Sequence, residues 1–212
     1  MSGGKGSRIK SPKEKPMILL NGKPMIEYII NALIESREFK RIIISTSDNT
    51  VSTNDFLKKR YHNVDIIKIF DSAGMGYSED LSSILEIIKP ERGLVVPADI
   101  PLLTSDIIKE ICKMYIKLDN DPPCLSIILD KEFVTQFGLK PSVTVRIGRG
   151  TYSHSGVSIF DSKVIKCGQI IKESYLKFNA KEIAFNINTK KDFLMLKKSL
   201  TSQLRIKRRQ EF

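Results

Sequence analysis

Short apolar runs alternate with amphipathic stretches through the first half of the chain. Four of the runs are rich in β-branched residues and bounded by polar turns, as buried parallel strands are; they begin near Arg41, Val64, Gly93 and Cys124. Apolar positions recur at helical spacing between these runs, in residues 24–36, 78–89 and 104–118. This alternation predicts a three-layer α/β fold with a mainly parallel sheet.

Polar residues predict where the helices begin. Ser78 and Thr104 each precede acidic residues and an apolar repeat, so both are predicted N-caps. The second half is less regular, with predicted strands at 142–147 and 155–160 around a glycine-rich turn and a final helix over 190–199. No repeat or linker divides the chain, and we expect a single domain over residues 1–212.

The composition is that of a folded protein without a membrane span. Apolar residues make up 41% and charged residues 28% of the chain, and no apolar stretch approaches the roughly 18 to 20 residues that a span requires. The N-terminus carries no apolar segment of the kind found in secretory signals. The three cysteines are scattered and form no CxxC pair, so neither a disulfide framework nor a zinc site is expected. We therefore expect a cytoplasmic protein.

The formal net charge of +11 has two interpretations. In the first, the lysine-rich surface only keeps the protein solvated; in the second, the positive field concentrates an anionic substrate near a cleft. Basic residues are spread along the chain, apart from a cluster at 205–209, and they do not interleave with aromatic residues. A nucleic-acid partner is therefore not expected.

A glycine-rich segment at residues 3–8 is the first candidate binding site. Glycines let successive N–H groups converge on an anion, while Lys5 and Arg8 add charge that can neutralise a triphosphate. Lys15, next to Pro16, supplies another cation a short loop away. The same composition is also typical of a flexible terminus, so these residues alone leave both interpretations open.

Asp99 is the candidate metal ligand. It lies just after the apolar run at 93–96, and ligands of parallel α/β sheets bind at the carboxyl ends of strands. A single carboxylate at that edge suits Mg²⁺, which binds one or two carboxylates together with substrate phosphates. The alternative for an isolated Asp-Ile-Pro sequence is a turn that leads into the next helix.

Taken together, these segments carry a family resemblance. GGKGSR at 3–8, followed by EKPMILLNGKPMIEY at 14–28, resembles the signature of the nucleotidyltransferase family that includes sugar-phosphate, molybdopterin and cobinamide transferases. GYSEDL at 76–81 and FNINTKKD at 185–192 are similar to the archaeal guanylyltransferases of that family that act on adenosylcobinamide phosphate. The resemblance covers essentially the whole chain and implies the nucleotide-diphospho-sugar transferase-like fold.

The resemblance also implies roles for individual residues. Arg8, Lys15 and Asp99 would be catalytic, with Asp99 holding Mg²⁺. The implied nucleotide-binding residues are Gly3, Gly4, Lys5, Gly6, Ser7, Arg8, Lys15, Thr46, Asn49, Gly76, Glu79, Asp80, Gly156 and Asn188.

Helix capping is the alternative role for several of these polar residues. Guanine presents N–H donors, so the carboxylates of Glu79 and Asp80 could read the base, yet acids at this position also stabilise a helix start. Asn186 and Asn188 precede the last helix, where asparagine is a common cap. His62 and His154 are expected to be surface or packing residues.

One departure from the family pattern concerns the strand that precedes the glycine loop in its members. Only Met1 and Ser2 precede the loop here, so the first strand is expected to be truncated, with a further apolar stretch upstream. The segment at 152–156 also differs from the Pro-Ala-Gly that members have near the acceptor.

The implied reaction is transfer of GMP from GTP to a phosphorylated small-molecule acceptor, adenosylcobinamide phosphate. Two alternatives remain: a molybdopterin or sugar-1-phosphate nucleotidyltransferase, and a non-catalytic nucleotide-binding domain. The oligomeric state is left open, with a homodimer as one option.

Overall fold

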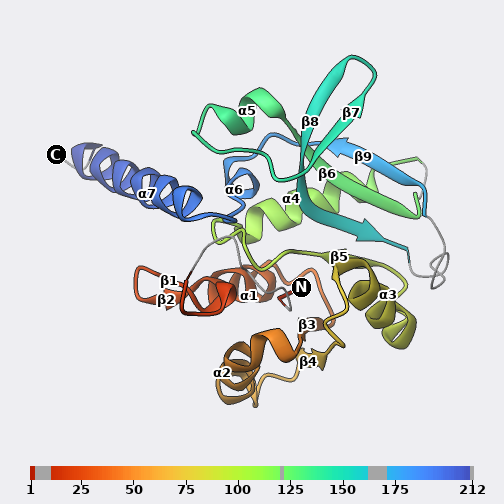
Figure 1. Ribbon diagram of the computed structural model, residues 1–212. Coiled ribbons are helices and arrows are strands. Elements are labelled where there is room, and N and C mark those ends of the chain that lie inside the picture. Colours follow the sequence, from red (N-terminus) through yellow and green to blue (C-terminus); the bar gives the residue numbers. More distant parts are fainter. Residues whose placement is uncertain (3–10, 120–121, 162–170, 211–212) are drawn as a thin grey trace.

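The computed structural model describes residues 1–2, 11–119, 122–161 and 171–210, and the side chains of these as far as residue 200 (Figure 1). The predicted glycine loop, Gly3, Gly4, Lys5, Gly6, Ser7 and Arg8, lies outside the described residues.

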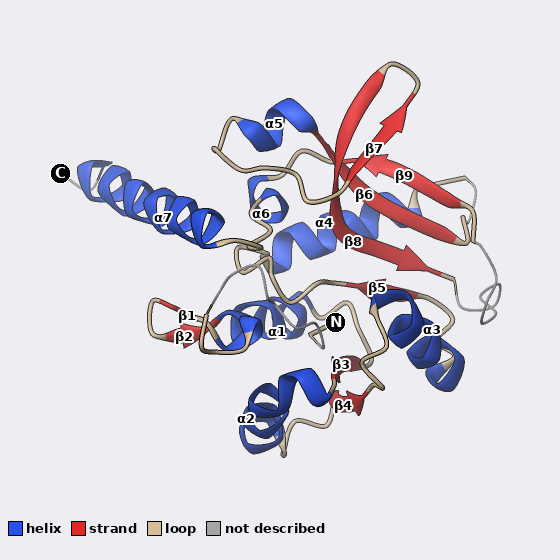
Figure 2. Cartoon of the chain, in the orientation of Figure 1, coloured by secondary structure: helices blue, strands red, loops and turns tan. Residues whose placement is uncertain are grey.

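The first half of the chain alternates strands and helices, as its apolar pattern predicts (Figure 2). In order, its elements are η2 (Lys15–Met17), β1 (Leu19–Leu20), β2 (Lys23–Pro24), α1 (Met25–Ser36), β3 (Ile42–Thr46), η3 (Asp48–Thr50), α2 (Val51–Tyr61), β4 (Ile67–Asp71), α3 (Tyr77–Ile88) and β5 (Gly93–Val95). Helix α2 was not expected, because its sequence is polar and has only a weak apolar repeat.

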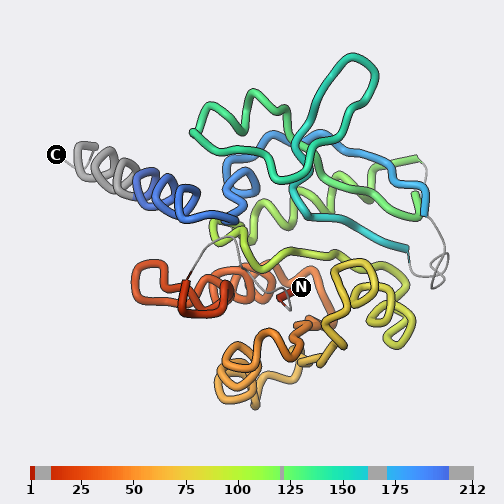
Figure 3. The backbone as a smooth tube through the Cα atoms, in the orientation of Figure 1, coloured from red at the N-terminus to blue at the C-terminus, as the bar shows by residue number. Residues whose placement is uncertain are grey.

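The second half consists mainly of longer strands and ends in a long helix. Its elements are α4 (Ser105–Ile116), β6 (Cys124–Asp130), α5 (Lys131–Thr135), β7 (Thr144–Ile147), β8 (Gly150–Phe160), β9 (Glu173–Lys177), α6 (Lys181–Ala184) and α7 (Lys190–Gln210). Helix α7 continues past the predicted end at residue 199, and the part of it that is coloured in Figure 3 points away from the larger sheet.

The predicted N-caps have different outcomes. Thr104 is the N-cap of α4, where its hydroxyl accepts a hydrogen bond from the N–H of Ile107 at 3.4 Å. Helix α3 begins two residues earlier than a cap at Ser78 implies, so the predicted cap is wrong and the N-cap is Gly76. The φ of Gly76 is +145°, a conformation that a residue with a side chain rarely adopts, and this fixes the helix start at the glycine.

The described strands form three sheets, one of which is the antiparallel pair of β1 and β2. β3 and β4 pair in parallel, with Ile42 opposite Ile67. The larger, five-stranded sheet has the order β5–β8–β6–β9, with β7 paired to β8. β9 runs parallel to β6, whereas β8 runs antiparallel to both β5 and β6. The α/β class is therefore confirmed, and β8 is the reversed strand within it.

Helices cover both faces of the larger sheet. Ile29 of α1 and Ile108 of α4 share a buried cluster with Ile127 of β6. Adjacent residues of a strand point to opposite faces, and in β5 Leu94 packs against this cluster whereas Val95 packs against α3. The three layers predicted from the sequence are therefore present. Among the described helices, none is both long enough and apolar enough to cross a bilayer.

Ile127 belongs to the largest buried cluster of the core, and its substitution tests how tightly that core is packed. It is 0% exposed, so Ile127→Ala should lower the free energy of unfolding by about 2 to 5 kcal/mol through lost burial and a residual cavity. Ile116→Ala is the matched control, because Ile116 is 73% exposed. Urea denaturation of both variants measures the difference, and equal losses would contradict this description of the core.

Candidate active site

Lys15 joins segments that are far apart in the sequence. Its ammonium donates to Oδ2 of Asp99 at 2.5 Å and to Oδ1 of Asn188 at 2.8 Å. The Lys15 and Asp99 side chains are 15% and 16% exposed, so solvent screens this ion pair only partly. The structure thus brings together three residues that were predicted separately.

The loop that carries Asp99 follows β5 and is held by its neighbours. The N–H of Ile187 donates to the backbone carbonyl of Asp99 at 2.8 Å, which brings the segment before α7 alongside it. Gly156 of β8 packs against Pro97, since a Cβ on Gly156 would lie 3.0 Å from Cγ of Pro97. Its φ of +83° also favours glycine. Gly156 therefore supports the Asp99 loop.

The two carboxylate oxygens of Asp99 differ. Oδ2 accepts from Lys15, whereas Oδ1 is buried and has no hydrogen-bond partner among the described residues. Leaving a buried carboxylate oxygen unpaired is costly, and a cation would relieve that cost. The described residues contain no group of three or more acidic, histidine or cysteine side chains that could hold a metal by themselves. One carboxylate supplemented by phosphates fits Mg²⁺.

Asn188 positions Lys15 and does not cap α7. Its amide nitrogen donates to Oγ of Ser142 at 2.8 Å and to Oδ1 of Asn186 at 2.5 Å, which leaves its oxygen for Lys15. The start of α7 is stabilised instead by Asp192, whose carboxylate accepts from the N–H groups of Asn188 and Thr189 at 3.0 and 2.7 Å. Helix capping, the alternative role considered for Asn188, is therefore wrong.

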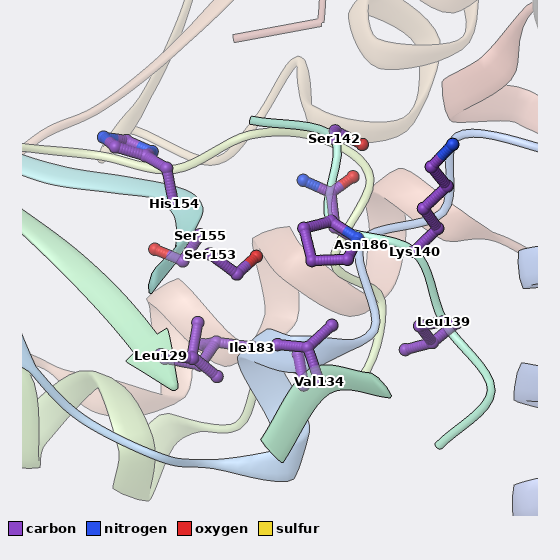
Figure 4. Close-up of a pocket in the computed structure, with 12 residues that line it drawn as sticks. Leu129, Val134, Leu139, Lys140, Ser142, Ser153, His154, Ser155, Ile183 and Asn186 are labelled. Carbon is purple, nitrogen blue, oxygen red and sulfur yellow. The ribbon is translucent and has the colours of Figure 1, made fainter. Parts of the chain in front are cut away.

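A small pocket beside this network is too tight for a substrate. Figure 4 shows Ser142 and Asn186 above apolar side chains that include Val134 and Ile183. Its volume is about 10 Å³, roughly the room that one water molecule occupies. Two of its lining residues, Ser142 and Asn186, are the ones that bind the Asn188 amide.

Thr46 is the last residue of β3, and Asn49 lies in η3, just after that strand. Thr46 is fully buried, donates to Oδ1 of Asp71 at 2.7 Å and accepts from Asn54 at 2.9 Å. The Asn49 side chain lies against Gly74, whose added Cβ would be 3.1 Å from Nδ2 of Asn49. The loops after the two strands therefore lie side by side, with Thr46 in a structural contact beneath them.

The two acids predicted to read the base have different environments. Asp80 is buried, and its Oδ1 accepts from the N–H groups of Gly74 and Met75 at 3.0 and 3.3 Å. Asp80 thus holds the loop before α3. Glu79 is exposed, and its Oε2 would be 2.7 Å from a Cβ added to Gly76. Of the two, Glu79 is the one available to a ligand.

His154 takes part in a polar cluster on β6, β8 and β9. Its Nδ1 accepts from the N–H of Gly156 at 2.9 Å, so Nε2 carries the proton and donates to Glu173 at 3.1 Å. Ser126 also donates to Glu173. The carboxylate separates the serine from the histidine, so the cluster lacks the serine–histidine hydrogen bond of a hydrolytic triad.

Glu14 was missed by the sequence analysis. Its carboxylate accepts from the N–H groups of Ser52 and Thr53 at 2.8 and 2.7 Å and from the Thr53 hydroxyl at 2.6 Å. This contact ties the residue before Lys15 to the start of α2. The unpaired helix N–H groups attract an acid, but its position 38 residues away gave no local signal. Ser142 and Asp71 were missed for the same reason, since their partners lie 46 and 25 residues away. Asp192 did have a local signal, because Thr189 and Asp192 have the spacing of a capping box.

Comparison with known proteins gives concordant matches. The family model described as the MobA-like NTP transferase domain matches residues 1–127. The adenosylcobinamide-phosphate guanylyltransferase of Methanocaldococcus jannaschii is 30% identical over 211 residues, covering 93% of this chain and 96% of that protein. The bifunctional protein GlmU of Thermoanaerobacter pseudethanolicus is 30% identical over 136 residues, which are 61% of this chain and 27% of that protein.

A solved structure supports the same fold. The 4-diphosphocytidyl-2C-methyl-D-erythritol synthase of Anaerococcus prevotii superposes with a TM-score of 0.63. The alignment covers 88% of this chain and 93% of that one at 13% identity. At this identity the likeness is evidence for a shared fold only.

The hydrogen bonds of the Glu14 carboxylate predict that stability depends on pH. Burial alone would raise the pKa of Glu14, but the hydrogen bonds from Thr53 and Ser52 outweigh it and hold the pKa below its ordinary 4.5. The stability contributed by Glu14 is therefore complete above pH 4.5 and is lost as the pH falls through the lower folded-state pKa. Glu14→Gln should destabilise the protein at pH 7, with a difference from the parent that shrinks toward pH 3.

Thermal unfolding across this pH range measures the effect. Glu35→Gln on α1 is the control, since Glu35 is exposed. A Glu14→Gln deficit that stays constant down to pH 3 would rule out the carboxylate contact as its cause.

Proposed function

Because the chain belongs to the MobA-like NTP transferase family, we propose that it transfers GMP from GTP to adenosylcobinamide phosphate. A phosphate oxygen of the acceptor attacks the α phosphorus of GTP, a new P–O bond forms, and the bond to the β phosphate breaks as pyrophosphate leaves. The relative that bears this activity in its name matches nearly the whole chain.

The contact between Lys15, Asp99 and Asn188 is the observation that carries the proposal. An ammonium has three N–H donors, and the described residues occupy two of the Lys15 donors with Asp99 and Asn188. The third is left for an anionic oxygen. Because Lys15 is held on two sides, it can neutralise phosphate charge without reorganising during the reaction. Arg8 is proposed to act with it on the triphosphate.

Mg²⁺ is the cofactor that the site would hold, through Asp99. Oδ1 of that carboxylate, which has no hydrogen-bond partner in the part of the chain that the structure describes, is the ligand atom that fits it. When bound, Mg²⁺ supplies positive charge that offsets the charge of the phosphates.

The described side chains suit a transfer without a protein nucleophile. A phosphate monoester is anionic at neutral pH, so the acceptor needs no strong general base. Burial raises the pKa of the Cys112 and Cys124 thiols to about 11, so neither supplies a thiolate near pH 7. Catalysis then consists of positioning and charge neutralisation. Free cysteines and a GTP substrate also fit a reducing cytoplasm.

Glu79 is the proposed reader of guanine. It is exposed at the start of α3, beside the loops that follow β3 and β4. A carboxylate there can accept from the N–H donors of guanine, which adenine does not present in the same arrangement. Asp80 contributes by holding the backbone of that loop.

Removal of the Asp99 charge tests the proposed chemistry. Asp99→Asn should reduce Mg²⁺-dependent pyrophosphate release by at least about 100-fold, because a preorganised charge at the phosphates is lost. Binding of GTP without metal should change little. Asp106→Asn on α4 is the matched control, as its side chain is 90% exposed. If Asp99→Asn keeps the parental rate and Mg²⁺ dependence, Asp99 has no part in the reaction.

Base selection provides an independent test. Calorimetric titration should show tighter binding of GTP than of ATP, CTP or UTP. Glu79→Gln should lower the preference for GTP over ATP about ten- to a hundred-fold, because one hydrogen bond to a charged group changes the affinity by about that factor. The control is Glu86→Gln, an exposed acid of the same helix. An unchanged preference in Glu79→Gln would leave Glu79 with a helix-stabilising role only.

A further inference from the structure

Helix α2 is capped by a residue from another part of the chain. Its N-cap, Thr50, makes no side-chain hydrogen bond to the helix, since the Thr50 hydroxyl donates to the carbonyl of Ser47 and accepts from the Ser47 N–H. The N–H groups in the first turn of a helix have no acceptor within the helix. Those of Ser52 and Thr53 donate to the carboxylate of Glu14, which lies 38 residues before Ser52. The position of α2 is therefore tied to Glu14.

The Glu14 carboxylate is fixed at three points. Oε1 accepts from the N–H of Ser52 at 2.8 Å, and Oε2 accepts from the N–H and the hydroxyl of Thr53 at 2.7 and 2.6 Å. Thr53 is buried, so its two donors depend on the carboxylate and not on solvent. The negative charge also suits the start of a helix, where the backbone dipoles are positive. Glu14 therefore cannot shift relative to α2 without loss of these contacts.

Backbone geometry passes this constraint on to Lys15. η2 begins at Lys15, directly after Glu14, and Pro16 is its second residue. The carbonyl of Glu14 accepts from the N–H of Met17 at 2.9 Å, and the ring of Pro16 restricts both its own φ and the backbone of Lys15. Because so little freedom is left between the two residues, a displacement of Glu14 moves the Lys15 ammonium relative to its partner Asp99.

The same helix start adjoins the loops proposed to hold the base. η3 runs directly into α2, and the N–H of Asn49 in η3 donates to the hydroxyl of Ser47 at 3.2 Å. Asn49 and Ser47 lie against Gly74, since a Cβ added to Gly74 would be 3.1 Å from Nδ2 of Asn49 and 3.3 Å from Cβ of Ser47. Gly74 belongs to the loop that leads to Glu79, the proposed reader of guanine. Glu14 thus connects the base side of the site with Lys15.

We propose that Glu14 is a positioning residue for the transfer reaction, because it holds the loops for the base and the lysine for the triphosphate in one fixed arrangement. GTP has to reach from Glu79 to Lys15, so the separation of these two groups decides whether the α phosphorus is aligned for attack. Binding energy at the base is then used to lower the barrier at the phosphates. Glu14 acts through Lys15 and α2 and takes no part in bond making. This role rests on the proposed function.

Charge alone predicts the opposite effect of a Glu14 substitution. GTP is an anion, so the negative charge of Glu14 opposes its binding, and loss of that charge favours binding. A fall in the rate after this charge is removed therefore reports altered geometry. A large fall in affinity, which loss of a phosphate-binding cation such as Lys15 would cause, is not expected.

Glu14→Gln gives the first test. Glutamine has the same size, but it offers one acceptor atom and places an NH₂ group against the N–H donors of α2. The kcat for pyrophosphate release from GTP should fall at least about tenfold, because small displacements of reacting groups are costly, while the KM for GTP should change less than about threefold. Glu35→Gln, at an exposed acid of α1, is the control and should retain the parental kcat. A parental kcat in Glu14→Gln, measured well below its Tm, would overturn the proposal.

Substitutions at Thr53 test the same contact from the helix side and leave the sequence of the Lys15 loop intact. Thr53→Val removes the hydroxyl that donates to Glu14 at 2.6 Å, and it should lower kcat about three- to tenfold, the factor that corresponds to one hydrogen bond. Thr53→Ser keeps the hydroxyl and should retain most of the parental kcat. An equal kcat in the two variants would assign any change to packing of the Thr53 methyl group and would contradict the proposal.

Comparison of GTP with ATP separates positioning from a general loss of structure. ATP is not expected to make the Glu79 contact, so alignment through the base contributes less to its kcat. Glu14→Gln should therefore narrow the ratio of the kcat for GTP to the kcat for ATP at least about threefold, while the ratio of their dissociation constants changes little. An equal loss of kcat with both nucleotides would indicate a general disturbance of the site and contradict the proposal. Absence of GTP turnover in the parent chain would instead refute the proposed transfer itself.

Discussion

The ion pair between Lys15 and Asp99 is the contact on which the rest of the site depends. Lys15 enters from the loop before α1, Asp99 from the loop after β5, and Asn188 from the segment before α7. None of these loops is fixed by its own sequence. A largely buried ammonium requires anionic and polar acceptors around it, and a largely buried carboxylate requires donors. The three segments therefore determine one another's positions.

Each partner of Lys15 has supports of its own. Glu14 ties the residue before Lys15 to the first turn of α2, Ile187 fixes the backbone of Asp99, and Ser142 and Asn186 orient the amide of Asn188. A side chain constrained in this way is preorganised, because little freedom is left to lose when phosphate binds. The unpartnered oxygen of Asp99 is the exception, and it lies where a cation would be useful.

The core is divided in a way that matches the sheets. One apolar cluster joins α1 and α4 to the larger sheet, another joins α1 and α2 to β3 and β4, and a small one lies between α3 and β5. Helix α1 contributes to the first two, with Ile29 facing one and Ile26 the other. It is therefore the element that holds the two sheets in their relative positions.

The sequence by itself determined the class of fold and named the main residues of the candidate site. Short β-branched runs and apolar repeats at helical spacing are local patterns, so the strands at Ile42 and Cys124 and the helices at Met25 and Ser105 could be predicted from them. Lys15, Asp99 and Asn188 could be named because they lie in motifs that resemble a family.

Only the tertiary structure decided how those residues are used. Asn188 and Thr104 are both polar residues near a helix start, yet one binds Lys15 and the other caps α4. Glu79 and Asp80 are neighbours with the same functional group, but Asp80 faces the backbone of its own loop and Glu79 faces solvent. Such roles depend on contacts between residues distant in the chain, which no local pattern records. Local periodicity could likewise not anticipate that β8 reverses direction between β5 and β6, because pairing is decided where strands meet.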